Sequence, residues 1–479
     1  MNRKPNVLFI VTDDQRYNTI AALGNREIIT PSMDRLVRMG TSFTSAHIPC
    51  GTVGAVCMPS RAMIHSGRSL FHIDDVGQQI PQTHTTLGEH LRGHGYNCFG
   101  TGKWHNGPKA FNRSFNGGDN IFFGGMWDHW NVPMNFYDPT AEYDNVINVV
   151  VNHFADNKIT KMHCDKFNPG KHSSELLTDT ALNFLSNRQA ARPQNPGQDP
   201  FFLYVAYLAP HDPRTMPPQF RKMYNADDIP LPQNFLEEHP VDFGFKTIRD
   251  EKLAAYPRNS GEVREQLADY YAMITHLDFE IGRILDNLEQ QGILENTIII
   301  LAGDNGLAMG SHGLMGKQNN YEHSVRVPLV MAGPGIPVNQ TRDQYVYLFD
   351  IFPTLCEMLD VEIPDSVEGL SFKKMLSDPS YVTRKELYFA YSDLIRSIKT
   401  DRFKLIEYRN TVNATQLFNL RDDPYECRSL FGQAGYDDTV KQLRAQLLRL
   451  AGEWGDILHP IGKRFWKSWE EYETRTGLT

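Results

Sequence analysis

The sequence predicts an α/β fold with a largely parallel central sheet. Three continuous apolar runs, Asn6–Thr12, Phe201–Leu208 and Thr297–Leu301, are typical of strands that are covered on both faces. Between the last two runs, Gln266–Gln291 carries apolar residues three or four positions apart and is followed by Gly292, which indicates a helix and its end. Strands that alternate with helices favour a parallel sheet.

The length of 479 residues exceeds what one core usually supports, so we expect a large domain and a smaller companion. After about residue 380 the sequence changes to short segments divided by turn residues, which predicts a small antiparallel sheet. These segments are Glu386–Ser392, Ile395–Lys399, Phe403–Glu407 and Gln416–Asn419, and a helix is expected near Thr439–Trp454. We therefore predict an α/β domain over 1–375 and a C-terminal α+β subdomain over 376–479.

Composition excludes several classes of protein. Apolar residues make up 41% of the chain and charged residues 22%, as in ordinary globular proteins. The net charge of -9, with no long basic run and no zinc-finger spacing, argues against nucleic acid as a partner. Six cysteines without CxxC pairs favour a mostly reduced chain. As written, the sequence predicts a cytoplasmic protein without a membrane span, although a secreted or periplasmic chain that lacks its signal peptide would look the same.

Polar residues follow the apolar runs where ligands of parallel sheets gather. Asp13 and Asp14 follow the first run, His211 follows the second, and Asp304 and Asn305 follow the third. Carboxylate and amide oxygens without thiolate or histidine partners suit calcium or magnesium better than zinc. An aspartate pair after a strand can also be only a turn or a helix cap, so this pattern alone leaves both interpretations open.

Cys57 begins the most distinctive motif, Cys-Met-Pro-Ser-Arg-Ala-Met-Ile-His-Ser-Gly-Arg. Pro59 presets a first helical turn and Gly67 can end the helix, which places Cys57 at a helix N-terminus that favours anions. Arg61, one turn further on, can reach the same end of the helix as a fixed cation. Without the surrounding motif, a buried structural thiol would be the simpler interpretation.

This motif resembles the signature of type I sulfatases, with Ser66 in place of the usual threonine. The resemblance implies an alkaline-phosphatase-like fold and a maturation enzyme that converts Cys57 to formylglycine. In that family the hydrated aldehyde attacks sulfur and later expels sulfate by collapsing back to the aldehyde. A geminal diol permits this because its second hydroxyl remains free after the ester has formed.

Three further segments resemble sulfatase motifs. Thr101–His105 resembles the family's G-K-W-H segment, Ala209–Pro213 its P-H-x-P segment, and Gly310–Lys317 its G-x-H-G-x-x-x-K run. The resemblance implies that Lys103 and Lys317 contact the sulfate. It also implies that His105 handles the proton of the diol, and that His211 protonates the departing alcohol.

The resemblance also implies a single metal ion. Gly303-Asp304-Asn305-Gly306 matches the sulfatase pattern, whereas the two-zinc phosphatases of the superfamily carry Asp-His there. The implied ligands are the side chains of Asp13, Asp14, Cys57 as formylglycine, Asp304 and Asn305. We expect one Ca2+ ion, with Mg2+ as the alternative.

The predicted activity is hydrolysis of a sulfate monoester to inorganic sulfate and an alcohol. A sulfated carbohydrate is the preferred substrate, because Phe111–Tyr143 is rich in aromatic residues that could stack on sugars and because similar bacterial sulfatases often act on glycans. For the segment taken by itself, a loop that packs its own small core is the favoured interpretation. A phosphonate monoester or phosphodiester hydrolase and a non-catalytic binder of sulfated glycans are the alternatives. The sequence does not reveal the oligomeric state.

Overall fold

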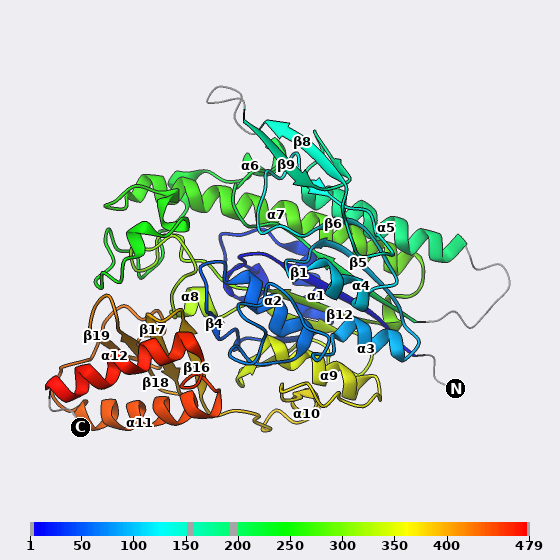
Figure 1. The fold of residues 1–479 in the computed structure, drawn as a ribbon. Coiled ribbons are helices and arrows are strands. Elements are labelled where there is room, and N and C mark those ends of the chain that lie inside the picture. Colours follow the sequence, from blue (N-terminus) through cyan, green and yellow to red (C-terminus); the bar gives the residue numbers. More distant parts are fainter. Residues whose placement is uncertain (1–3, 151–157, 191–199, 477–479) are drawn as a thin grey trace.

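The computed structural model of the chain describes residues 4–150, 158–190 and 200–476. Its centre is an eight-stranded sheet in the order β14-β2-β13-β12-β1-β11-β5-β6 (Figure 1). The strands are β1 (Asn6–Thr12), β2 (Gly40–Phe43), β5 (Asn97–Lys103), β6 (Gly117–Phe122), β11 (Phe201–Ala206), β12 (Thr297–Gly303), β13 (Leu329–Ala332) and β14 (Gln340–Arg342). The strands from β12 to β6 in this order run parallel, and β13 runs antiparallel to β12. The predicted parallel sheet is confirmed.

Both faces of the sheet are covered, which explains why the central strands are apolar throughout. On β1, Leu8 and Ile10 belong to one buried cluster, whereas Phe9 and Val11 belong to the other. Alternating side chains of a strand point to opposite faces, so each cluster receives every second residue. The two clusters lie under two different layers of helices.

The first layer holds α1 (Pro31–Met39), α5 (Ser173–Ala190), α6 (Pro218–Arg221) and α7 (Ser260–Gln290), and the second holds α2 (Cys57–Ser66), α3 (Leu87–Gly93), α4 (Pro108–Ser114), α9 (Ile351–Met358) and α10 (Lys373–Ser377). In Figure 1, α5 and α7 lie on one side of the sheet and α2, α3 and α9 on the other. Helix α7 begins earlier than predicted because Asn259 caps it, accepting hydrogen bonds from the amides of Gly261 and Glu262.

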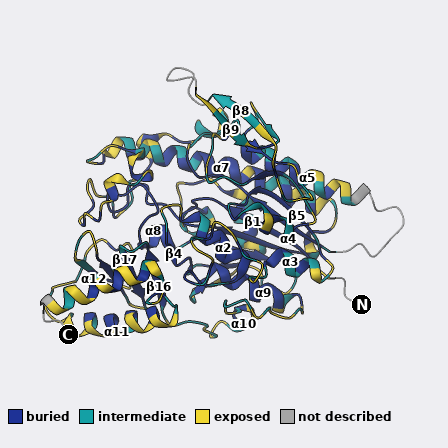
Figure 2. Ribbon diagram, viewed as in Figure 1, coloured by how far each residue is buried: buried dark blue, intermediate teal, exposed yellow. Residues whose placement is uncertain are grey.

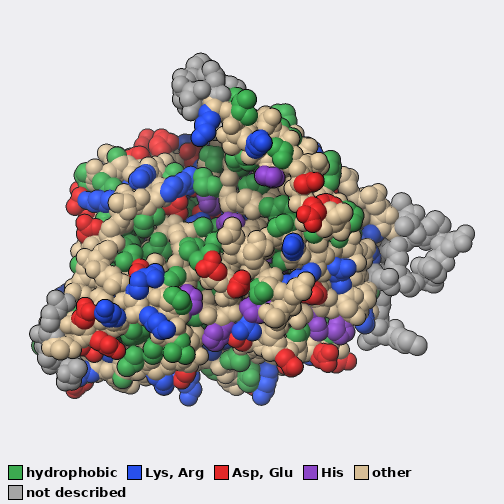
Figure 3. All heavy atoms as spheres, in the orientation of Figure 1, with side chains coloured by type: hydrophobic (Ala, Val, Ile, Leu, Met, Phe, Trp, Pro, Cys, Tyr) green, Lys and Arg blue, Asp and Glu red, His purple; other side chains and the backbone are tan. Residues whose placement is uncertain are grey.

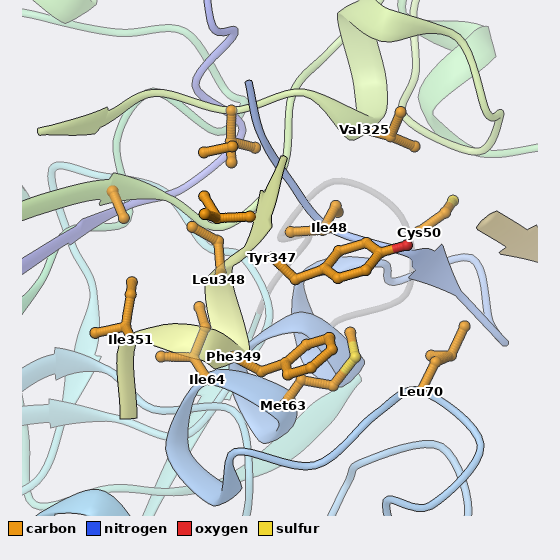
Figure 4. Packing of buried hydrophobic residues seen from close by; sticks show 14 of the residues in the cluster. Ile48, Cys50, Met63, Ile64, Leu70, Val325, Tyr347, Leu348, Phe349 and Ile351 are labelled. Atoms are coloured by element: carbon orange, nitrogen blue, oxygen red, sulfur yellow. The ribbon is translucent and has the colours of Figure 1, made fainter. Parts of the chain in front are cut away.

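Helix α2 is fixed in place by its buried face. Met63 and Ile64 pack beside Leu348 and Phe349 in the second layer (Figure 4). Gly67 ends the helix with φ +66°, and its amide donates to the carbonyl of Met63. The helix therefore covers Cys57–Ser66 and is stopped by Gly67, as the sequence predicts.

A second sheet, in the order β19-β18-β17-β16-β4, lies beside the first. It consists of β4 (Cys50–Gly51), β16 (Leu387–Tyr391), β17 (Ile395–Lys399), β18 (Phe403–Tyr408) and β19 (Ala414–Asn419). Helices α11 (Asp437–Glu453) and α12 (Pro460–Thr476) pack against it, and Figure 2 shows exposed residues along both of them. The predicted antiparallel segments are present, but β4 comes from the N-terminal part and pairs parallel with β16. The division at residues 375 and 376 stays a prediction.

Shorter elements complete the described part of the chain. The paired strands are β3 (Ala46–His47) with β15 (Val346–Tyr347), β7 (Pro133–Met134) with β10 (Lys166–Phe167), and β8 (Val146–Val150) with β9 (Ile159–His163). A short helix, α8, spans Glu322–Val325. The stretch 192–200, whose prolines predict a loop, lies almost entirely outside the described residues. No helix within the described ranges is long and apolar enough to cross a bilayer.

Candidate active site

The predicted polar residues meet at one end of the central sheet. Strands β12, β1, β11 and β5 are neighbours and run parallel, so their carboxyl ends lie along the same edge. Asp13 follows β1, Asp304 follows β12, and Lys103 is the last residue of β5. His211 lies a few residues beyond β11. This arrangement is the general location of ligand sites in open α/β sheets.

Acidic side chains at this edge form two overlapping clusters. Ligand atoms of Asp13, Cys57 and Asp304 lie within 4.8 Å of one another, and so do those of Asp13, Asp14 and His211. Asn305 Nδ2 donates to Asp14 Oδ1 over 2.7 Å, which brings the last predicted ligand into the group. Within the described residues, the buried oxygens Asp13 Oδ1 and Asn305 Oδ1 have no hydrogen-bond partner. Buried acceptors of this kind suit a divalent cation with a preference for oxygen.

Helix α2 presents Cys57 to these carboxylates. The thiol belongs to the first residue of the helix, and only 2% of Cys57 is exposed. Ser60 Oγ donates to the Asp304 carbonyl over 2.6 Å and Arg61 Nε donates to Asp304 Oδ2 over 2.8 Å. Arg61 Nη1 also donates to the Lys103 carbonyl over 2.6 Å. The observed contacts of Arg61 therefore fix Asp304 and the end of β5.

Two lysines and a histidine surround the thiol. Lys103 Nζ lies 2.5 Å from Asp13 Oδ2 and 3.3 Å from Cys57 Sγ. Lys317 Nζ lies 2.5 Å from Asp14 Oδ1. His105 Nδ1 lies 3.5 Å from Cys57 Sγ. A tetrahedral anion at residue 57 would thus meet positive charge from both lysines.

The site keeps its lysines charged and His105 neutral. Burial opposes the charge on both lysines, but Asp13 raises the pKa of Lys103 and Asp14 raises the pKa of Lys317 above the ordinary lysine value. Burial, together with the charges of Lys103 and Arg61, lowers the pKa of His105 well below 6.5. A neutral imidazole beside residue 57 can accept a proton.

The two carboxylates nearest to Cys57 differ in proton affinity. Burial disfavours ionisation of both, but Lys103 and neighbouring cations outweigh it at Asp13, whose pKa is lowered. At Asp304, burial and the charge of Asp13 act together, and the pKa rises to about 6. A bound divalent cation would favour the ionised form of both groups.

His211 is held by contacts that the sequence did not reveal. Its Nε2 lies 3.7 Å from Asp14 Oδ2, and its Nδ1 lies 2.8 Å from the Asp212 carbonyl. Asp212 pairs in turn with Arg249, whose Nη1 donates to Asp212 Oδ1 over 2.7 Å. His129 Nε2 lies 3.0 Å from the carbonyl of His211 itself. No local pattern marks Arg249, because it is distant in sequence and its role depends on the fold.

Two polar residues within or next to the predicted motifs, Gln15 and His312, make their contacts elsewhere. Gln15 is buried and bonds to Thr12 and Thr19 rather than to the aspartate pair. His312 stacks on Tyr321 with 3.9 Å between ring centroids, and its Nε2 lies 2.9 Å from the Glu426 carbonyl. Both contacts support the loop that carries the site, and neither side chain faces Cys57.

The aromatic segment 111–143 divides between core and surface. Phe111 and Phe115 are buried and pack edge-on against Trp104, whereas Phe136 is 51% exposed. Trp127 is half-buried and lies near Phe167. The segment therefore packs a small core at one end and presents aromatic surface at the other.

Comparisons with known proteins agree with this geometry. The sulfatase family model matches residues 5–361, and the model for the C-terminal region of N-sulphoglucosamine sulphohydrolase matches residues 310–453. An N-acetylglucosamine-6-O-sulfatase of Bacteroides thetaiotaomicron is 25% identical, covering 92% of this chain and 85% of that protein. An arylsulfatase of Clostridium perfringens is 27% identical, covering 93% and 94%.

Among solved structures, BT4656 in complex with D-glucosamine-2-N,6-O-disulfate superposes with a TM-score of 0.74 at 24% identity. The match covers 96% of this chain and 99% of that one. Because the match covers nearly the whole of both chains, the two proteins share the overall fold.

Proposed function

This chain belongs to the sulfatase family and is a sulfuric ester hydrolase, and on that premise we propose that it removes sulfate from a sulfated carbohydrate. The single observation that carries the proposal is the position of Cys57. Its thiol lies at the start of α2, among two lysines, a neutral histidine and a cluster of unsatisfied oxygen ligands.

The family implies that residue 57 acts as formylglycine, and the surroundings of Cys57 support this form. Burial raises the pKa of the thiol despite the nearby lysines, so an unmodified Cys57 would stay protonated and be a weak nucleophile. The Cys57 Sγ position stands for a hydroxyl oxygen of the hydrate. When present, the hydrate supplies the attacking oxygen and a second hydroxyl through which sulfate can be released.

We assign one calcium ion to Asp13, Asp14, Asp304 and Asn305, with the side chain of residue 57 completing the set. The orphaned oxygens of Asp13 and Asn305 support this assignment, because hard oxygen ligands match calcium. When bound, the ion supplies positive charge against the oxygens of the sulfate.

Lys103 and Lys317 hold the sulfate in this proposal. Their ammonium groups flank the aspartate pair and remain charged at neutral pH, so they stabilise negative charge that grows as the ester bond breaks. Arg61 positions Asp304 and adds a fixed charge behind it.

The two histidines divide the proton transfers. His105 lies against residue 57 and is neutral, so it accepts the proton that a hydroxyl there must lose. His211 Nε2 lies 3.7 Å from Asp14 Oδ2, while its Nδ1 is held by the Asp212 carbonyl, so Nε2 is the nitrogen available to the ester. In its protonated form, His211 gives the Nε2 proton to the departing alcohol.

A panel of substrates tests the reaction. We expect turnover of at least one sulfated saccharide and of an aryl sulfate, and little turnover of an aryl phosphonate monoester. Faster hydrolysis of the phosphonate than of any sulfate would favour the phosphonate hydrolase alternative, and turnover of the aryl ester alone would contradict the carbohydrate assignment.

Mass spectrometry of the peptide that carries residue 57 tests the nucleophile. Conversion replaces sulfur by oxygen and removes two hydrogens, so the aldehyde is lighter than the thiol. Unconverted Cys57 in an inactive protein that still binds sulfated glycans would support the non-catalytic alternative.

Metal analysis and chelation test the ion. We expect about one calcium per chain, loss of activity and a lower melting temperature after chelation, and recovery on adding calcium, since a ligand that binds only the folded state stabilises it. Recovery with magnesium but not calcium would contradict the calcium assignment.

A further inference from the structure

A hollow of about 740 Å³ opens beside the catalytic end of the sheet. Its lining includes Met126, Trp127, Asp128, Asn131, Phe167 and Pro213. None of these residues belongs to the nucleophile, the metal cluster or the lysine pair described above. The hollow is of the size that small-molecule sites have, so its position and chemistry decide what it can bind.

The segment that lines the hollow touches both candidate proton-transfer histidines. A β-carbon on Gly125 would lie only 3.1 Å from His105 Nε2, so the backbone there passes directly over that ring. Two residues after Trp127, His129 Nε2 lies 3.0 Å from the carbonyl of His211. Pro213 follows His211 by two positions and forms part of the wall. The hollow therefore adjoins the side of the site where the alcohol departs.

The chemistry of the wall fits a sugar ring. Trp127 is half-buried and offers an indole to the hollow, with Phe167 close to it at 6.3 Å between ring centroids. Asp128 is exposed and uses Oδ1 to accept from the Trp130 amide over 3.0 Å, which leaves the acidic group at the surface of the hollow. Asn131 Oδ1 is buried and has no partner among the described residues. An aromatic face combined with hydrogen-bond acceptors is the pattern that recognises the apolar faces and hydroxyls of carbohydrates.

We propose that this hollow binds the sugar unit on the leaving-group side of the sulfate, with Trp127 against the ring face and Asp128 and Asn131 accepting hydrogen bonds from its hydroxyls. The inference rests on the proposed function, since it assumes that the sulfate ester is that of a carbohydrate. It assigns the choice of sugar to a segment outside the matched catalytic motifs. Residues 126–131 are thus specificity determinants, while residue 57 and its neighbours perform the chemistry.

The test compares two substrates for each variant: the sulfated monosaccharide that the unmutated chain hydrolyses fastest, and 4-nitrophenyl sulfate. We expect Trp127→Ala and Asp128→Ala each to lower kcat/KM for the sugar by about tenfold or more, mainly through KM, because they remove ground-state contacts. For Asp128→Ala, turnover of the aryl ester should stay within about threefold of the unmutated enzyme, since that ester has no hydroxyls to bind.

Two further variants show whether a loss of activity comes from the missing contact or from misfolding. Trp127→Phe should retain most of the sugar activity, because it keeps an aromatic face in the hollow. Phe136→Ala removes an aromatic ring of the same segment that is 51% exposed and outside the lining, and it should leave both substrates unaffected.

The possible outcomes distinguish failure of the proposed function from failure of the sugar-binding assignment. If the unmutated chain hydrolyses no sulfated saccharide, the proposed function fails and this inference fails with it. If it hydrolyses one but Asp128→Ala leaves the sugar unaffected, or lowers both substrates equally, the hollow is not the sugar subsite and the proposed function stands.

Discussion

Lys317 shows how strongly single side chains should affect this site. Its ammonium lies 2.5 Å from Asp14 Oδ1 in a buried position. We expect Lys317→Met to lower kcat by roughly a hundredfold or more, because a preorganised charge aimed at the sulfate is lost. Steady-state kinetics on an aryl sulfate measure the effect, with Lys109→Met at an exposed lysine as the control. A Lys317→Met enzyme with normal kcat would remove Lys317 from the proposed clamp.

The stability of the protein should depend on pH through one buried carboxyl group. Asp278 on α7 is 1% exposed and accepts hydrogen bonds from the amides of Ser32 and Met33, and burial raises its pKa from 3.8 to about 6. A carboxyl whose pKa is higher in the folded state stabilises the fold below its unfolded pKa, and this contribution is lost as the pH rises through the folded value. Asp278 should therefore favour folding at acidic pH and not at neutral pH.

Between about pH 5 and about pH 7.5, we expect the free energy of unfolding of the unmutated protein to fall by about 1–2 kcal/mol relative to that of the Asp278→Asn variant. Urea unfolding of both proteins across this range measures the difference. Asp286→Asn, at an exposed position on the same helix, should run parallel to the unmutated protein. If the free energy of unfolding of Asp278→Asn also changes with pH in parallel with that of the unmutated protein, the burial of Asp278 does not shift its pKa.

Individual site residues could be predicted from the sequence where a motif is local. Cys57, Arg61, Lys103 and His211 all lie in short runs with recognisable spacing, and the structure gathers these runs at one end of the sheet. Arg249 could not be predicted, because it reaches Asp212 only through the folding of a long loop. The catalytic roles themselves stay predictions until they are measured.

At the scale of elements, the end of α2 is tightly packed. Gly67 and Gly292 have nearly the same φ, +66° and +65°, but a β-carbon on Gly67 would lie 2.8 Å from Val367 Cγ1, whereas one on Gly292 meets nothing within 4 Å. Both Gly→Ala variants carry the cost of a left-handed residue, about 1 kcal/mol. Only Gly67→Ala also collides with its neighbours.

We therefore expect Gly67→Ala to destabilise the protein by about 1–3 kcal/mol more than Gly292→Ala. Thermal or chemical unfolding of the two variants side by side measures the difference. Equal losses would show that Val367 moves aside without cost and that the end of α2 tolerates displacement.

The elements also show why strand prediction succeeded unevenly. Strands β1, β11 and β12 are apolar throughout because both faces are covered, and continuous runs reveal them. Strand β5 carries Gly100 and Gly102, whose missing side chains let Phe111 and the carbonyl of Ala206 approach closely. Glycines normally argue against a strand, so β5 could not be predicted from the sequence. Tertiary packing explains why glycine occupies positions 100 and 102.

At the scale of the whole molecule, the two sheets depend on each other. Trp454 packs edge-on against Tyr347 with 5.2 Å between ring centroids, and Lys404 of the second sheet lies 3.1 Å from Glu322 Oε1 of α8. Lys404 also lies 2.8 Å from Glu426 Oε1. Separating the sheets would expose an apolar face and take both lysine partners, Lys399 and Lys404, away from Glu322, which is costly.

We expect a chain that ends at residue 375 to be insoluble or to lack a cooperative unfolding transition, because β4 would lose its partner β16 and remain an open edge. Solubility on expression and circular dichroism on heating measure this. Co-expression of 376–479 as a separate polypeptide should restore soluble protein. A stable, cooperatively folded 1–375 would instead support two independently folding domains.

The pairing of β4 with β16 joins two strands that are synthesised at very different times. Residues 50 and 51 leave the ribosome early, whereas their partners Ala390 and Tyr391 are made near the end of translation. Until then β4, which ends six residues before Cys57, has no partner strand. We therefore expect an enzyme that oxidises this thiol to act most readily before β16 has been made and paired.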